Sequence, residues 1–145
     1  MFSKALLTVS LLAGIAFATP TPSSILEKRD VNCRGTVYSD SQLEACRRTL
    51  CLYDNRQGPG GYPHFFANHE LLNFGSYTGD LYEYPLVRGS RAYNGVVLAN
   101  EFSLGAPGPD RCVAAYDAVT GNCDLLGAMT HTGAPANNRN RFFLC

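Results

Sequence analysis

The chain has 145 residues, with 12 lysines and arginines against 12 aspartates and glutamates. Residues 30–145, which we expect to be the mature protein, keep nine arginines, no lysine and eleven acidic residues, a net charge of about −2. A mildly acidic protein has no broad cationic surface for a polyanion, which disfavours long, processive nucleic-acid binding and leaves only local contacts through a few arginines. These 116 residues suffice for one small domain with a single modest core.

The first 29 residues have the pattern of targeting and processing segments. Residues 1–18 contain a lysine followed by an apolar run that ends in AFA, which is typical of a secretory signal peptide. Residues 19–29 form a Pro/Ser-rich propeptide that ends in the dibasic pair Lys28-Arg29. The apolar run is too short for a comfortable membrane span. We therefore expect a secreted, extracellular protein without a membrane partner.

All six cysteines lie in the expected mature part. Because the secretory route is oxidising, the sequence predicts three disulfides, with fifteen possible pairings. A zinc site is the alternative, but no CxxC pairs occur and the three histidines are not grouped with the cysteines. We expect no metal and no cofactor.

One helix is predicted after the short extended segment GTVYS, within residues 39–55. Either Ser39 with Gln42 or Ser41 with Glu44 offers a capping box at its start. The glycine and proline cluster QGPGGYP cannot continue a helix. The residues that recur at helical intervals are Leu43, Cys46, Leu50 and Tyr53.

The rest of the chain has the pattern of strands and loops. Gly, Pro, Asn and Asp turn signals separate the strand candidates, and residues 89–108 fit either a hairpin or a loose surface loop. One helix followed by a run of strands predicts an α+β domain, with the N-terminal helix packed on a central antiparallel sheet. The candidate strands are residues 62–66, 80–87, 111–116 and 125–132.

Taken singly, four polar residues of these strands are explained as ordinary packed or surface residues without a function: His64, Glu83, Arg111 and His131. Strand alternation changes this, because side chains two positions apart share a face. Tyr62, His64 and Phe66 then point one way. On their own strands, Glu83, Arg111 and His131 each lie among apolar neighbours that face the other way. If the strands are adjacent, one sheet face carries a carboxylate, two imidazoles and a guanidinium.

This set matches what phosphodiester cleavage through an internal 2′-hydroxyl requires. The reaction needs a base near one oxygen, an acid near the leaving oxygen and a fixed cation beside the phosphoryl oxygens. RNA supplies its own nucleophile, so the reaction requires no metal.

The segments YPHFFANHE, YEYP, PGPDR and THTGA, in this order and followed by a Phe-x-x-Cys ending, resemble the fungal guanyl-specific ribonuclease family. The resemblance extends from Cys33 to Cys145. It implies a monomeric endoribonuclease with the disulfide-stapled microbial ribonuclease fold. Such an enzyme cleaves single-stranded RNA 3′ to guanosine, first to a 2′,3′-cyclic phosphate and then to a 3′-phosphate.

The resemblance also assigns catalytic roles. Glu83 takes the 2′-hydroxyl proton, and His64 assists or shares that role. His131 protonates the departing 5′-oxygen, and in the second step it activates water while Glu83 acts as the acid. The residues that the resemblance places around the phosphate are Tyr62, Arg111 and Phe142.

Guanine selection is expected in the loop after the first of these segments. There Glu70 would accept hydrogen bonds from N1 and N2 of guanine, a donor pair that adenine lacks. Asn68 keeps the family residue, whereas Ala67 replaces an asparagine. Phe66 and His69 stand where the family has tyrosines on either side of the base, so we expect a relaxed guanine preference with a weaker, pH-dependent lid.

Two segments are longer than in the family: the one before PGPDR, and PANNRNRF near the end of the chain. The second leaves open whether Asn137 or Asn138 reaches the guanine. It also adds Arg139 and Arg141, which either contact phosphates or solvate the loop.

The two bridges common in the family correspond to Cys33–Cys145 and Cys51–Cys123. The remaining pair is Cys46 with Cys112. Cys112 follows Arg111, so it points away from the active face and toward the helix that carries Cys46, which makes this bridge sterically reasonable.

Three alternatives compete with this interpretation. A ribotoxin typically carries long basic loops, which a net charge of about −2 without lysine does not support. A catalytically silent effector or binding protein with the same fold would be expected to lose the acid, the base or the arginine, all of which are present. A purely structural disulfide-stapled protein explains the cysteines equally well but not the catalytic constellation.

Overall fold

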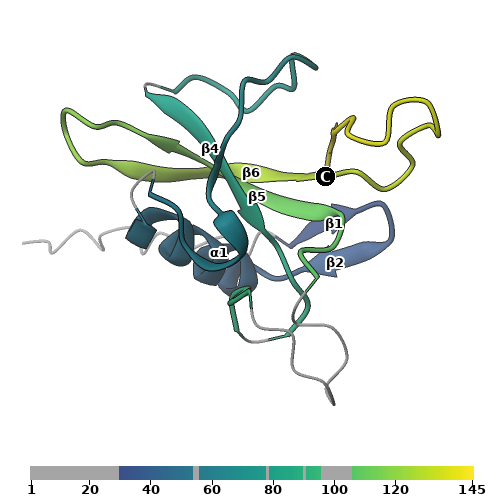
Figure 1. The fold of residues 1–145 in the computed structure, drawn as a ribbon, viewed down its shortest axis with the longest axis horizontal. Coiled ribbons are helices and arrows are strands. Elements are labelled where there is room, and N and C mark those ends of the chain that lie inside the picture. Colours follow the sequence, from purple (N-terminus) through teal and green to yellow (C-terminus); the bar gives the residue numbers. More distant parts are fainter. Residues whose placement is uncertain (1–29, 54–55, 78, 90, 96–105) are drawn as a thin grey trace, which may run out of the picture.

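A computed structural model describes residues 30–53, 56–77, 79–89, 91–95 and 106–145 (Figure 1). The predicted signal peptide and propeptide, and most of the stretch 89–108, lie outside the described residues. In the described part, no helix is long and apolar enough to cross a membrane.

The helix α1 (Asp40–Tyr53) packs against one face of a five-stranded antiparallel sheet in the order β3-β4-β5-β6-β7 (Figure 1). A separate hairpin of β1 (Val31–Cys33) and β2 (Thr36–Tyr38) precedes the helix, and a short 3-10 turn, Pro59–Gly61, follows it. The predicted α+β class is therefore confirmed. The sheet strands are β3 (His64–Phe65), β4 (Asp80–Pro85), β5 (Asp110–Tyr116), β6 (Cys123–Thr130) and β7 (Phe143–Leu144).

Two details differ from the sequence prediction. The strand predicted from residue 62 shortens to β3, and Tyr62 lies before it in the core on the helix side of the sheet, whereas Phe66 joins the cluster on the other side. The Tyr62 ring packs with the core cluster, yet it stacks on His64 and its hydroxyl oxygen accepts from Arg111, so Tyr62 reaches the same site as His64 although the regular strand begins only at residue 64. The edge strand β7 and the β1-β2 pairing were not predicted, since their segments are too short to show a period.

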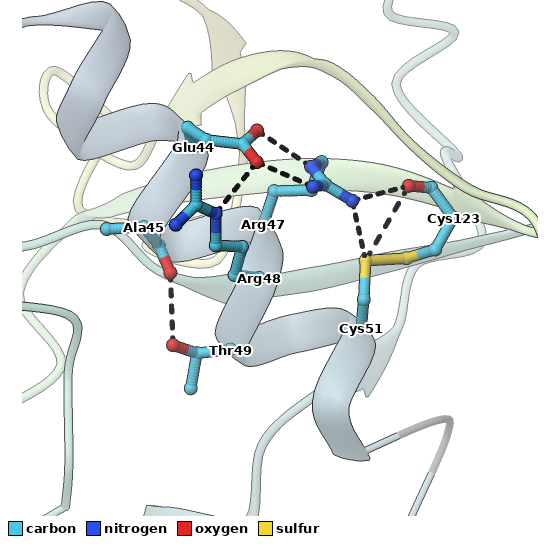
Figure 2. Close-up of polar contacts among 7 residues, drawn as sticks. All are labelled: Glu44, Ala45, Arg47, Arg48, Thr49, Cys51 and Cys123. Carbon is cyan, nitrogen blue, oxygen red and sulfur yellow. Dashed lines mark hydrogen bonds and ion pairs between the residues drawn. A yellow bond between two sulfur atoms is a disulfide. The ribbon is translucent and has the colours of Figure 1, made fainter.

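The helix begins with one of the two predicted capping boxes. The Ser39 backbone N–H donates to Gln42 Oε1 at 2.9 Å, and the Gln42 N–H lies 3.4 Å from Ser39 Oγ. The alternative capping box of Ser41 with Glu44 does not form, because the Glu44 carboxylate pairs with Arg47 and Arg48 one turn further on (Figure 2). The hydrogen bond from Arg47 is the main cause that lowers the pKa of Glu44 to about 2.

Three disulfides fasten the layers together with the pairing that the sequence predicts. One joins β1 to the last residue of the described chain, and another joins α1 to β5. The third joins α1 to β6 and is drawn in Figure 2. Beside the last of these, Arg47 Nη1 donates to the Cys123 carbonyl at 3.0 Å, which adds a polar tie between helix and sheet. The bridges are Cys33–Cys145, Cys46–Cys112 and Cys51–Cys123.

The capping box yields a stability prediction. Ser39→Ala removes the side-chain acceptor at the start of the helix and should lower the free energy of unfolding by about 0.5–2 kcal/mol. Urea denaturation with the disulfides intact measures the change. Ser41→Ala is the control, because Ser41 contacts the Ser39 hydroxyl but caps no backbone N–H in the described structure. An equal loss in both variants would show that the box contributes nothing of its own.

Candidate active site

The register of the sheet brings the four polar residues together on the face opposite the helix. β3 and β4 place His64 directly across from Glu83. On β5, Arg111 lies two positions from the residue that pairs with Glu83, so the two side chains are diagonal neighbours on one face. The partner of Arg111 on β6 is Met129, two residues before His131. The sheet therefore carries the constellation on a single face, as predicted.

Glu83 occupies the centre of this face and is only 8% exposed. His64 Nδ1 lies 3.3 Å from one carboxylate oxygen, and Arg111 Nε lies 3.5 Å from the other. This second oxygen and Arg111 Nε are both buried without an aligned hydrogen-bond partner among the described residues. Buried polar atoms are normally hydrogen-bonded, so this pair is held by its mutual charge attraction rather than by an aligned hydrogen bond.

The surroundings of Glu83 make it a better proton acceptor than an exposed carboxylate. Burial raises the pKa of Glu83 above its ordinary value because the low-dielectric surroundings disfavour the charged form. The positive charges of Arg111, His64 and His131 oppose this rise without cancelling it. A carboxylate with a raised pKa is a stronger base than an exposed one.

Arg111 is a rigid, buried cation. Its Nη1 donates to the carbonyls of Pro107, Gly108 and Asp110 at 3.2, 2.8 and 2.8 Å. Its Nη2 donates to the Tyr62 hydroxyl oxygen at 3.0 Å. Since that oxygen accepts from Arg111, the Tyr62 O–H remains able to donate. A guanidinium and a phenol thus stand side by side as donors.

His131 follows the end of β6 and lies on the ring of Phe142, with 3.7 Å between the ring centroids and 26° between their planes. Its Nδ1 lies 3.0 Å from the Arg141 carbonyl. A carbonyl can only accept, so Nδ1 carries a proton and Nε2 is the position that gains or loses one. His64 stacks in the same manner on Tyr62, at 4.0 Å.

Most of the predicted base-binding residues lie in the loop after β3, whereas Asn137 and Asn138 lie between β6 and β7. Glu70 Oε1 accepts a hydrogen bond from the Phe142 backbone N–H at 3.2 Å, which ties this loop to the C-terminal segment. Asn68 bonds both to the N–H and to the carbonyl of Leu72, at 2.8 and 2.9 Å, and therefore shapes the loop. Phe66 is buried against the rings of Phe74 and Phe142. The exposed members of the set are His69, Asn137 and Asn138.

The support of Arg111 was not visible in the sequence. An ion pair with its neighbour Asp110 is the simple expectation, yet Asp110 points to the other side of the strand and accepts from the Tyr38 hydroxyl at 2.7 Å. The backbone of the PGPDR segment holds the guanidinium instead. Its proline and glycine residues signal a tight turn, but they do not show that three carbonyls converge.

Among the described residues, no group of histidine, cysteine, aspartate and glutamate side chains is arranged to hold a metal ion. The polar groups that gather at the site are a carboxylate, two imidazoles, a phenol and a guanidinium.

Comparisons with known proteins agree with this arrangement. The family model described as ribonuclease matches residues 26–145. The guanyl-specific ribonuclease F1 of Fusarium fujikuroi is 33% identical over 141 residues, which cover 95% of this chain and 93% of the relative. Guanyl-specific ribonuclease U1 of Ustilago sphaerogena is 39% identical over 74% of this chain and 90% of its own, and guanyl-specific ribonuclease T1 of Aspergillus oryzae is 32% identical over 95% of both. The chain therefore belongs to the ribonuclease family that includes these fungal guanyl-specific ribonucleases.

Proposed function

We propose that the protein is a secreted, monomeric endoribonuclease that cleaves single-stranded RNA on the 3′ side of guanosine without a metal ion. Its mature domain would be residues 30–145, after removal of the signal peptide 1–18 and the propeptide 19–29. The observation that carries the proposal is the buried Glu83 carboxylate between an imidazole and a fixed guanidinium. The names of the fungal relatives support the guanine preference.

In the first step Glu83 removes the proton from the 2′-hydroxyl. The 2′-oxygen then attacks the adjacent phosphorus, and the bond from phosphorus to the 5′-oxygen breaks. His131 Nε2 donates its proton to that 5′-oxygen, which leaves as a hydroxyl. A charged His64 beside Glu83 favours the ionised carboxylate and helps to position it for proton transfer.

Negative charge builds on the phosphoryl oxygens as the 2′-oxygen attacks. The Arg111 guanidinium and the Tyr62 hydroxyl are donors that need no reorganisation, because backbone carbonyls and core packing already hold them. Phe142 stacks on His131 and excludes water from one side of its imidazole. In the second step the roles reverse: His131 activates a water molecule, Glu83 returns the proton to the 2′-oxygen, and a 3′-phosphate results.

Guanine selection rests on the loop that carries Glu70. One of its oxygens is bonded to the Phe142 N–H, so the carboxylate is held at a fixed place beside the catalytic face. A fixed carboxylate favours a base edge with two adjacent N–H donors, which guanine has and adenine lacks. His69 and Asn137 or Asn138 are exposed and free to close on the base, and the buried Phe66 supports the loop from below.

The reaction itself is tested by cleavage of GpC, ApC, UpC and CpC in excess EDTA. We expect guanosine 2′,3′-cyclic phosphate to be released fastest. Glu83→Gln and His131→Ala should each lower kcat/KM on GpC by about 100- to 10,000-fold, because each removes a proton-transfer group. Glu44→Gln on the helix is the control. No turnover of any dinucleotide or of long RNA would leave a silent binding protein as the best account.

The raised pKa of Glu83 predicts a pH effect. The acid limb of kcat/KM on GpC should report the ionisation of Glu83 in the free enzyme. His64→Gln removes a positive charge that lowers this pKa, so the acid limb should move to higher pH. The pH profile of Glu44→Gln serves as the comparison and should keep the wild-type acid limb, because Glu44 pairs with Arg47 and Arg48 on the helix, away from the candidate site. Loss of the acid limb in His64→Gln would instead make His64 the principal base.

The role of Glu70 is tested by Glu70→Gln, which keeps an oxygen for the Phe142 N–H but removes the negative charge. The ratio of kcat/KM on GpC to that on ApC should fall by about 5- to 150-fold, the effect of 1–3 kcal/mol for one unsatisfied buried partner. Steady-state kinetics on both dinucleotides measure it. An equal loss on both substrates would mean that Glu70 only holds the loop.

A further inference from the structure

A second group of cations lies beside the active site, around the ring of Phe143 on the edge strand β7. The Arg34 guanidinium carbon lies 3.8 Å from the centre of this ring, and that of Arg141 lies 5.2 Å from it. Arg34 belongs to the turn between β1 and β2, whereas Arg141 directly precedes Phe142 and β7. The aromatic ring thus gathers two cations from opposite ends of the chain.

Covalent and steric constraints hold the two segments together. The bridge Cys33–Cys145 connects the residue before Arg34 to the end of the described chain, and Figure 1 shows the β1-β2 hairpin and the C-terminal segment at the same end of the molecule. Gly133, at φ +85°, leaves room for Arg34, because a side-chain carbon there would lie 2.5 Å from Arg34 Nη1. The arginine pair is therefore largely pre-positioned.

Neither guanidinium has an anionic partner. Both side chains are exposed, and in the described part of the chain neither takes part in an ion pair. By contrast, three other arginines of the domain pair with a glutamate. Two like charges that share one ring repel each other, so an anion bound between them would relieve that repulsion. A phosphate diester suits this geometry, because guanidinium groups bind its oxygens through paired N–H donors.

The pair is connected to His131 through the Arg141 backbone and through Gly133. The Arg141 carbonyl contacts His131 Nδ1, and His131 is the acid that faces the 5′-oxygen of the departing nucleotide in the proposed reaction. Arg34 lies against Gly133, two residues beyond His131. The Phe143 ring belongs to the face opposite the catalytic face, since Phe143 pairs with Thr130 rather than with Met129. A strand that continues 3′ from the cut therefore reaches the pair after passing over the turn that follows His131.

We propose that Arg34 and Arg141, gathered on Phe143, form a subsite for a backbone phosphate of RNA on the 3′ side of the scissile bond. The inference rests on the proposed ribonuclease function and extends it from a dinucleotide to a longer strand. It also gives Arg141 a phosphate to bind, in preference to the alternative that it merely solvates the loop. For a domain with a net charge of about −2, two pre-positioned cations are an efficient way to orient a polyanion.

The test compares kcat/KM on GpC, GpCpC and GpCpCpC, which add one phosphate at a time on the 3′ side. We expect the first or second added phosphate to raise kcat/KM by about tenfold, the lower range for hydrogen bonds to a charged group. That gain should decline with added NaCl, with a logarithmic slope of about −0.7 for one phosphate contact on a single strand. In the double variant Arg34→Gln/Arg141→Gln, kcat/KM on the 3′-extended substrates should be nearly equal to kcat/KM on GpC.

Arg56→Gln is the matched control, because Arg56 is an exposed arginine beyond the helix and should leave the ratio of kcat/KM on the 3′-extended substrates to that on GpC unchanged. The 5′-extended CpGpC is the substrate control, and its advantage over GpC should not depend on Arg34 or Arg141. No gain on 3′ extension, a gain that persists in the double variant, or an equal loss for the 5′ extension would overturn the subsite.

A binding measurement separates failure of the subsite from failure of the proposed function. Analogues of GpC and GpCpCpC that lack the guanosine 2′-hydroxyl cannot be cleaved, so their dissociation constants report binding alone. We expect the wild type to bind the longer analogue about tenfold more tightly than the shorter one. The double variant should bind the two analogues with equal dissociation constants. If the protein does not cleave GpC, the proposed function fails. The difference between the dissociation constants of the two analogues still decides whether the arginine pair recognises a phosphate. Thermal unfolding of each variant confirms that it is folded.

Discussion

The ion pair between Glu83 and Arg111 is the interaction around which the sheet is organised. Both groups are nearly inaccessible to water, and removing two charges from solvent costs several kcal/mol for each ion unless close partners compensate. Arg111 finds such partners in three carbonyls and the Tyr62 hydroxyl. Glu83 is less well compensated, since one oxygen has only the ion pair at 3.5 Å. The remainder of the fold must therefore stabilise that arrangement.

Strand alternation explains how one sheet supplies both the stabilisation and the chemistry. On β4, Glu83 faces the substrate side, and its neighbours Tyr82 and Tyr84 enter the core beneath α1. On β5, Arg111 faces the substrate side and Cys112 is bonded to the helix through Cys46. Glu83 and Arg111 thus have immediate neighbours in the packed core, and the disulfides hold the helix against the face that those neighbours occupy. Small motions of the catalytic groups would require motion of the core.

The sequence predicted the parts of this arrangement that depend on local pattern. The period of Leu43, Cys46 and Leu50 predicted the helix, and alternation in the long strands placed Glu83 and Arg111 on one face. Alternation alone does not place Tyr62, which lies before the two-residue strand β3, although its ring stacks on His64 and its hydroxyl contacts Arg111. The carbonyl cradle of Arg111 was also missed, since converging backbone groups leave no pattern in side-chain identity. The contact of Glu70 with Phe142 joins residues 72 positions apart, which no local pattern can indicate.

The buried and the exposed arginines of this domain have different tasks toward RNA. The domain is mildly acidic, so its overall field repels a polyanion and attraction must come from short range. Arg111 is too deeply buried to capture RNA from solution, because its donors are directed to fixed carbonyls and to Tyr62. Capture therefore falls to exposed arginines without acidic partners, and such cations are useful only where the strand enters or leaves the site. Arg34 and Arg141 satisfy both conditions, since they are exposed and are linked to His131 through its own turn and through a backbone carbonyl. A buried cation for the transition state and exposed cations for the strand are separate requirements, and different segments of this chain meet them.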